Sequence, residues 1–183
     1  YMRTTAARLL RHGFETFRLN FRDHGGSHHL NPGLFHSNLI DEVVHAAADI
    51  ARRFPRRPLT VAGYSLGGNF ALRLALRAPA AGLAIDRVAV VCPLMDPART
   101  MDAMERGRMP YLRHFEGRWR ASLQRKRALF PDHYDFDDRV LRMRMRPLTQ
   151  WLVERNTDYG TLDRYFDGYS IAGDRLASLQ VPA

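Results

Sequence analysis

Helical and strand patterns alternate along the first half of this 183-residue chain, and no other feature restricts its fold as strongly. Three stretches place apolar residues at helical spacing, namely 2–12, 39–54 and 66–79. Three other stretches have the apolar runs of strands, namely 14–21, 59–64 and 85–94. The order helix, strand, helix, strand, helix, strand predicts an α/β fold with a mainly parallel sheet and flanking helices. The strands rich in Val, Ala and Leu lack strict alternation, which is typical of strands covered on both faces.

The pattern changes after residue 95. Residues 96–168 are rich in Arg, Met and aromatic residues, and they show no strand pattern. We expect three helices in that range, at 98–107, 109–129 and 137–155. The final stretch, YSIAGDRLASLQVPA, predicts a helix and the beginning of another strand. The predicted parts are therefore a core over 1–95, an all-helical insertion over 96–168, and a return to the core over 169–183. The predicted sheet is incomplete at both ends of the chain.

The stretch VAGYSLGGNF, residues 61–70, joins a predicted strand directly to a predicted helix. Its residues 63–67 fit the pattern G-x-S-x-G, in which a serine occupies a strained strand-to-helix turn. Glycines are expected at both ends of the motif because side chains there would collide with the turn. Ser65 is then the candidate nucleophile, and the backbone N–H of Leu66 is placed to stabilise an oxyanion. The alternative is a plain strand–helix turn in which Ser65 only caps the helix.

Three stretches together resemble the YheT-like branch of the α/β-hydrolases: GYSLGGNFALRLA, FRLNFRDHGGS and LFHSNLIDEVVHAAADI. The second is similar to the loop N-[FY]-R-G-x-G-x-S of that branch. The third is similar to its turn [YF]-H-x-G-x-x-x-D, matched here by Phe35 and His36. Asp23 and Asn38 stand where the family usually has glycine. The resemblance covers about residues 1–95.

The resemblance implies serine-dependent hydrolysis of carboxylic esters through an acyl-enzyme on Ser65, without a cofactor. In that family the catalytic acid and histidine follow the nucleophile late in the chain, and the alignment places both beyond Ala183. The insertion over 96–168 would be a helical lid. Its methionines suit medium or long acyl chains and other lipid-like substrates, and Tyr64 is predicted to contact substrate. Acyl transfer by the same nucleophile, or a non-catalytic binding protein on this fold, are the alternatives.

Other residues with catalytic side chains have plainer interpretations. His133 lies near carboxylates in FPDHYDFDD but is expected at the surface of the helical insertion. Asp96 is expected to be a turn residue or a helix N-cap rather than the catalytic acid. Cys92 is expected to be packed rather than reactive, and a single cysteine fits a reducing compartment. Four histidines in one loop lack acidic or cysteine partners at ligand spacing, so no metal is predicted there: His24, His28, His29 and His36.

The net charge of +9 raises the question of a nucleic-acid partner. The arginines are spread along the chain, however, and no helix-turn-helix, finger or RNA-binding signature is present, so no nucleic acid is predicted. No apolar run of about 18 residues exists, so no membrane-spanning helix is predicted. A cytoplasmic protein acting on a small ester is expected. The run RMRMR at 142–146 leaves peripheral membrane contact open beside the simpler interpretation of a solvated face.

Overall fold

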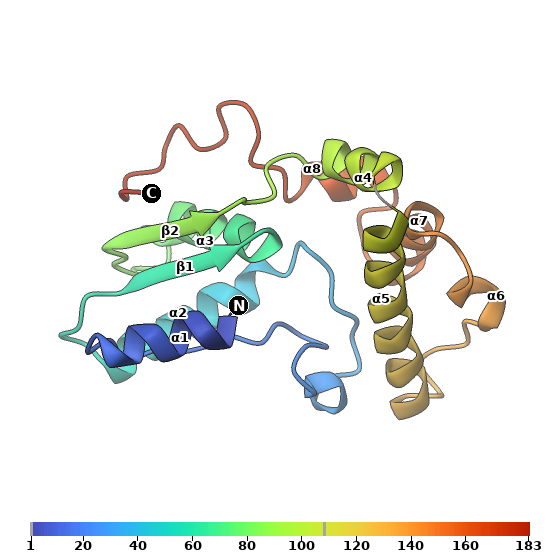
Figure 1. Cartoon of the computed structure of the whole chain (residues 1–183), viewed down its shortest axis with the longest axis horizontal. Helices are drawn as coiled ribbons and strands as arrows, with labels where there is room; N and C mark the ends of the chain where they lie inside the picture. The colour runs from blue at the N-terminus through green and yellow to red at the C-terminus, as the bar shows by residue number, and fades with distance from the viewer. Residues whose placement is uncertain (1, 108) are drawn as a thin grey trace.

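The computed structural model describes residues 2–107 and 109–183. Its elements follow in the order α1 (Met2–Arg11), η1 (Ser27–Leu30), α2 (Ile40–Arg53), β1 (Thr60–Tyr64), α3 (Leu66–Arg77), β2 (Arg87–Val91), α4 (Pro97–Arg106), α5 (Met109–Leu129), α6 (Asp138–Leu141), α7 (Met145–Asn156) and α8 (Leu162–Asp167). Both strands point toward the helices of the second half of the chain (Figure 1). The turn that follows β1 therefore lies between the core and those helices.

The two strands confirm the predicted parallel direction. They pair in parallel from Thr60 opposite Arg87 to Tyr64 opposite Val91, with α3 as the crossover between them. Within the described residues the sheet consists of these two strands. The structure thus has a small parallel sheet in a helix-rich chain.

The predicted strand over 14–21 is wrong, because no strand is assigned to these residues. A strand needs a neighbour that accepts and donates backbone hydrogen bonds, and within the described residues the sheet consists of β1 and β2 alone. Phe14 and Phe17 are each 53% exposed, so no packed layer covers them, although the Phe17 ring lies 5.3 Å from that of Phe54. Only the last aromatic residue joins the core, where the Phe21 ring lies 4.5 Å from that of Phe70.

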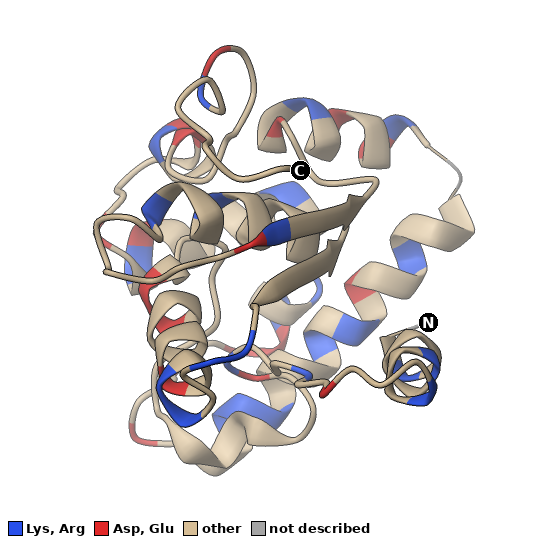
Figure 2. Cartoon of the chain, turned by 90° about the vertical axis from the view of Figure 1, so that its left-hand side faces the viewer, with Lys and Arg blue, Asp and Glu red and all other residues tan. Residues whose placement is uncertain are grey.

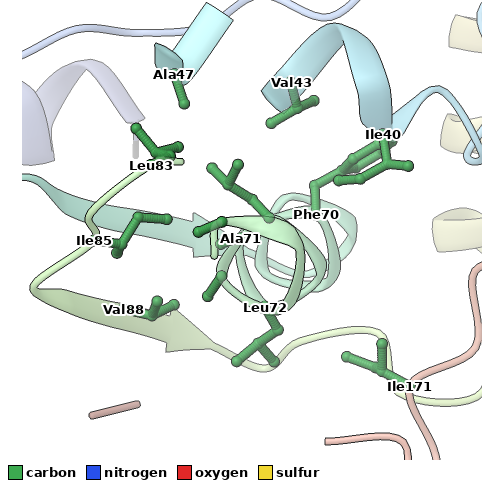
Figure 3. Close-up of a cluster of buried hydrophobic side chains, with 13 residues drawn as sticks. Ile40, Val43, Ala47, Phe70, Ala71, Leu72, Leu83, Ile85, Val88 and Ile171 are labelled. Carbon is green, nitrogen blue, oxygen red and sulfur yellow. The ribbon is translucent and has the colours of Figure 1, made fainter. Parts of the chain in front are cut away.

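The main core surrounds α3. Every residue of α3 from Gly68 to Ala75 is buried, as expected for a helix packed on all sides. Side chains from α2, the strands and the end of the chain close around it (Figure 3). The buried apolar residues of this cluster are Ile40, Val43, Ala47, Phe70, Ala71, Leu72, Leu74, Ala75, Ala78, Leu83, Ile85, Val88 and Ile171. The helix that begins at the serine turn is therefore the most firmly held element of the core.

The range 96–168 is helical, as predicted, with α4 and α5 close to their expected bounds. The single helix expected over 137–155 is wrong, since the chain forms α6 and α7 with a break between them. Pro147 explains the break: it is tolerated in the first turn of α7, whereas a helix interior would lose a hydrogen bond there. The short helix α8 was not predicted, although Thr161 caps it by accepting the N–H of Arg164 at 3.3 Å. The division of the chain at 95 and 168 stays a prediction.

The end of the chain returns to the sheet without the predicted helix. Residues 173–178 form turns instead, and Gly173 has a φ of +68°, a left-handed conformation that interrupts a helix. Ile171 N–H donates to Met95 O at 2.9 Å, and Val88 N–H donates to Pro182 O at 2.9 Å. The chain end therefore runs beside the segment that follows β2 and then beside β2 itself.

A buried ion pair joins α5 to the loop over 22–33. Lys126 is fully buried, and its ammonium donates to Asp23 Oδ1 at 2.6 Å and to Asn31 O at 2.5 Å. Asp23 has a φ of 59°, a left-handed conformation that favours glycine. Its other carboxylate oxygen accepts the N–H of Phe35 at 2.9 Å. Two segments about a hundred residues apart are thus held by one fully satisfied lysine.

Charged side chains are otherwise interspersed over the helices, where blue and red segments lie close together (Figure 2). The basic residues 142–146 illustrate this, because Arg144 pairs with Glu116 at 2.9 Å, and Arg146 with Asp102 at 2.5 Å and Glu105 at 2.8 Å. Within residues 2–107 and 109–183, no helix has both the length and the apolar content that crossing a bilayer requires.

Glu116 allows a prediction about acid stability. Its side chain is 4% exposed and accepts from Arg144 Nε at 2.9 Å and from the N–H of Met145, the first residue of α7, at 3.0 Å. Burial favours its neutral form, but the hydrogen bonds and charge of Arg144 and the Met145 N–H outweigh this, so its pKa is lowered. A lowered pKa means that Glu116 stabilises the fold above the unfolded value of 4.5 and that this contribution declines as the pH falls further.

Glu116→Gln is therefore expected to lower the free energy of unfolding by about 2 kcal/mol at pH 7. The difference from the unsubstituted protein should shrink below pH 4.5. Urea unfolding of both proteins between pH 3 and 7 measures it. A difference that stays constant with pH would show that the carboxylate charge does not stabilise the start of α7. Glu154→Gln, an exposed substitution near the other end of α7, is the control.

Candidate active site

The serine turn has the strained geometry expected from the motif. Ser65 lies between β1 and α3 with a φ of 50° and a ψ of −120°, a conformation that non-glycine residues rarely adopt. Its side chain is exposed and makes no capping hydrogen bond to α3. The interpretation of Ser65 as a plain helix cap is therefore wrong. A conformation of this kind costs free energy and is typical of sites where a side chain must be presented.

Close approach of the backbone explains one of the two motif glycines. A Cβ atom on Gly63 would lie within 2.6 Å of three backbone atoms of Gly67 and Gly68. At Gly67 the expectation of a collision is wrong, because a Cβ there would meet no heavy atom of the described residues within 4 Å outside its own helix. The second tight position is Gly68, whose Cβ would lie 3.0 Å from Pro93 Cβ. The strand and the helix therefore touch at Gly63, and the helix touches the next strand's end at Gly68.

Backbone hydrogen bonds lock the turn between α3 and the segment after β2. The carbonyl of Ser65 accepts three N–H groups, from Gly68 at 2.9 Å, Asn69 at 3.1 Å and Leu94 at 3.1 Å. The N–H of Ser65 donates to Val91 O at 3.0 Å. The N–H of Leu66 donates to no group of the described residues, and it lies at the positive end of α3. An exposed hydroxyl and a free backbone donor thus occur side by side.

Tyr64 precedes the serine and is half-buried. Its hydroxyl lies 2.9 Å from Thr5 Oγ1 on α1, so the ring extends toward that helix. Its predicted contact with substrate stays a prediction.

The histidines and acids of the chain do not form a triad with the serine. None of the hydrogen bonds among residues 2–107 and 109–183 joins the Ser65 hydroxyl to a histidine or a carboxylate. His133 is exposed in the helical segment, with its ring beside Phe130. Asp96 caps α4 by accepting the N–H of Arg99 at 3.0 Å, so its prediction as an N-cap is confirmed.

The loop histidines hydrogen-bond to the protein itself. His24 Nδ1 lies 2.8 Å from Arg22 O, and His28 Nε2 lies 2.8 Å from Ser122 Oγ. Burial lowers the pKa of His28 and also that of His36. In the part of the chain that the structure describes, no three His, Cys, Asp or Glu side chains gather as metal ligands would.

An open groove of about 770 Å³ lies beside the segment that follows β2, and neither Ser65 nor Leu66 lines it. Pro93 and Met95 line one side of it. Leu94, between them, donates its N–H to the carbonyl of Ser65. Met104 and Tyr111 line the other side, from α4 and α5. Apolar side chains form much of the lining. The charged lining residues are Asp96, which caps α4, and Arg99, whose guanidinium lies 3.4 Å from the Asp96 carboxylate.

Cys92 lies next to this groove and differs from its prediction. It follows β2 as Ser65 follows β1, it has a φ of 46°, and it is exposed rather than packed. An apolar run predicts burial, but β2 has one face and its end open to solvent, so the thiol after it is not covered.

Two residues important to the turn were missed from the sequence. Asn69 is fully buried and Arg73 is 7% exposed, both on α3. Their spacing of four residues within an otherwise apolar helix was the available signal, because it places both polar groups on one helical face.

Comparison with known families agrees with this geometry. A family model described as "Serine aminopeptidase, S33" matches residues 1–182. Comparison with curated proteins and with solved structures gave no match. The family match includes the strand, the serine turn and the helix that follows. Since it spans nearly the whole chain, the protein belongs to the serine aminopeptidase S33 family, a family of serine hydrolases in the α/β-hydrolase superfamily.

Proposed function

We propose that this serine hydrolase cleaves carboxylic esters, with Ser65 as the nucleophile. One observation carries the proposal: the exposed Ser65 hydroxyl, at a φ of 50°, lies beside an N–H of Leu66 that has no acceptor in the described residues. Attack of the hydroxyl oxygen on an ester carbonyl gives a tetrahedral oxyanion, which the Leu66 N–H stabilises. Expulsion of the alcohol leaves an acyl-enzyme, and water then releases the carboxylic acid.

A base must take the proton of Ser65 and later return it to the leaving alcohol. We propose that a histidine, oriented by an acid, does this from beyond residue 183, as in the YheT-like branch. The order nucleophile, acid, histidine of α/β-hydrolases supports this placement. The Ser65 hydroxyl is without a partner among the described residues, which leaves it available to such a base.

The groove beside the segment after β2 supports medium or long acyl chains as substrates. Its volume of about 770 Å³ and the methionines in its lining, Met95 and Met104, fit a flexible apolar group. In this proposal the helical segment 96–168 is the lid that shapes the acyl site. Small-molecule esters, including lipid-like ones, are thus the expected partners.

The family description favours a second candidate, hydrolysis of an aminoacyl amide. An aminopeptidase must bind the substrate's ammonium group, for which a free carboxylate at the site is suited. In the groove Asp96 is the lining carboxylate, but one oxygen caps α4 and the other lies 3.4 Å from Arg99. This engagement is why we place ester hydrolysis first.

The test uses the complete native polypeptide, a fluorophosphonate probe, and mass spectrometry of the adduct. Labelling at Ser65 that is lost in Ser65→Ala is expected, with ester turnover lost in the same variant. Acetyl, octanoyl and palmitoyl esters and aminoacyl amides, compared at equal concentration, decide between the two candidates. Formation of a new ester when an alcohol acceptor is added would instead favour acyl transfer. A folded protein that is not labelled would refute the hydrolase mechanism and favour a non-catalytic binding protein.

A further inference from the structure

Helix α3 carries a polar pair inside the main core. Asn69 has no exposed surface and Arg73 is 7% exposed, although the residues around them are apolar. Burying an amide and a guanidinium costs free energy unless each is hydrogen-bonded. The partners of this pair therefore indicate what the pair holds in place.

The Asn69 side chain joins three separate segments. Its Nδ2 donates to Leu94 O at 2.9 Å and to Tyr169 O at 2.7 Å. These two carbonyls belong to the segment after β2 and to the segment after α8. A fully buried amide on the first turns of α3 thus fixes the two chain segments that lie next to the serine turn.

The same residue also holds the serine itself. The backbone N–H of Asn69 and the N–H of Leu94 both donate to Ser65 O, each at 3.1 Å. The Asn69 side chain in turn holds Leu94 O. Ser65, Asn69 and Leu94 therefore form a closed ring of hydrogen bonds, in which a shift of one member moves the carbonyl of Ser65.

Arg73 sets the orientation of the amide. Its Nη1 donates to Asn69 Oδ1 at 3.3 Å and to Ser37 O at 2.8 Å, and its guanidinium lies 5.4 Å from the centre of the Phe70 ring. No carboxylate of the described residues pairs with it. Burial lowers its pKa to about 10, which leaves it cationic at neutral pH. Its charge therefore favours the amide oxygen on its own side and directs the amide nitrogen to the two carbonyls.

We infer that Asn69, oriented by Arg73, is a positioning residue for Ser65. By holding the segment after β2 against the turn, it sets where the Ser65 hydroxyl and the Leu66 N–H stand relative to the groove. The inference rests on the proposed function, since it concerns the reactivity of the same serine. It gives the buried pair a role in the chemical step rather than in packing alone.

Asn69→Asp is the sharpest test, because it changes the shape of the side chain very little. A carboxylate oxygen in place of Nδ2 cannot donate to either carbonyl. Misplacement of a reacting group by about 1 Å can cost about a hundredfold in rate, so we expect kinact of Ser65 labelling to fall by about ten- to a hundredfold. The KI of the probe and the KM for esters should change less than kinact, because Asn69 itself does not line the groove.

Thr149→Val is the matched control. Thr149 is also buried and donates to a backbone carbonyl, Met145 O at 2.7 Å, but it lies on α7 away from the turn. Its loss should lower the melting temperature without changing kinact. A variant that loses stability alone therefore separates packing from positioning.

The outcomes are distinguishable from those for the proposed function. If the unsubstituted protein is not labelled, the proposed function fails. If it is labelled and folded Asn69→Asp reacts at the same rate, the inference alone fails. Should Asn69→Asp not fold, Arg73→Met decides, because it keeps both amide donors and removes the guanidinium that orients them. It also removes the donors to Ser37 O and Gly168 O, so its unfolding is measured beside its kinact. A fall of about three- to tenfold in kinact supports the inference, and an unchanged kinact overturns it.

Discussion

Gly63→Ala is expected to prevent the serine turn from forming. The added Cβ would lie within 2.6 Å of Gly67 O, Gly67 C and Gly68 N, and backbone atoms cannot move aside as a side chain does. β1 and α3 would have to separate, although α3 is the centre of the main core. We expect a loss of about 4 kcal/mol or more in the free energy of unfolding, which is large for a single substitution. Urea unfolding measures the loss, and fluorophosphonate labelling shows whether Ser65 still reacts.

Gly67→Ala is the matched control for this prediction. It adds the same single methyl group four residues along, where the Cβ has open space around it. Alanine is also the better helix former, so stability should be unchanged or higher by about 0.5–1 kcal/mol. Equal destabilisation by the two substitutions would contradict the close contact between β1 and α3 at Gly63.

Lys126→Met is expected to cost about 3–5 kcal/mol of unfolding free energy, because it leaves a buried charge without its partner. The Asp23 side chain is 5% exposed and lies 2.6 Å from the ammonium. The substitution also takes a donor from Asn31 O and His28 O. Methionine has nearly the shape of lysine without its charge, so a large cavity is not the cause. Thermal and urea unfolding of the variant measure the effect.

The double variant Asp23→Asn with Lys126→Met tests the cause. Removing both charges should recover most of the loss, because no unpaired ion remains in the interior. Asparagine is chosen because it tolerates the φ of 59° at this position. Losses that simply add, without a coupling energy between the two substitutions, would show that packing and not the ion pair is responsible.

Local apolar periodicity predicted most of the helices and both strands. The helices α2 to α5 and the strands β1 and β2 agree with the apolar spacing of the sequence, and each packs against another element. The helix α1 was also predicted, although none of its residues is buried. Residues 14–21 did not form the predicted strand. Their alternation permits a strand, but hydrogen bonds to a neighbouring strand decide whether one forms, and periodicity within one segment carries no information about that neighbour.

The sequence predicted the serine turn of the candidate site but not the buried residues that hold the turn in place. The motif around Ser65 is local, so five residues were enough to predict a strained strand-to-helix turn. Asn69 acts through partners 25 and 100 residues away, and those contacts exist only in the folded chain. Gly67 shows a further limit: a motif gives the residue type, but only the packed backbone shows which glycine is under steric constraint.

Because Lys126 is buried, chemical modification of its amine can measure local opening of the fold. Lys126 is the only lysine among 183 residues, and its amine is sealed between α5 and the loop over 22–33. Reagents that acylate amines need an accessible, unprotonated nitrogen, so they can modify this position only when the two segments separate. The rate at which that one peptide gains mass therefore measures how often α5 separates from the loop over 22–33, without an engineered residue.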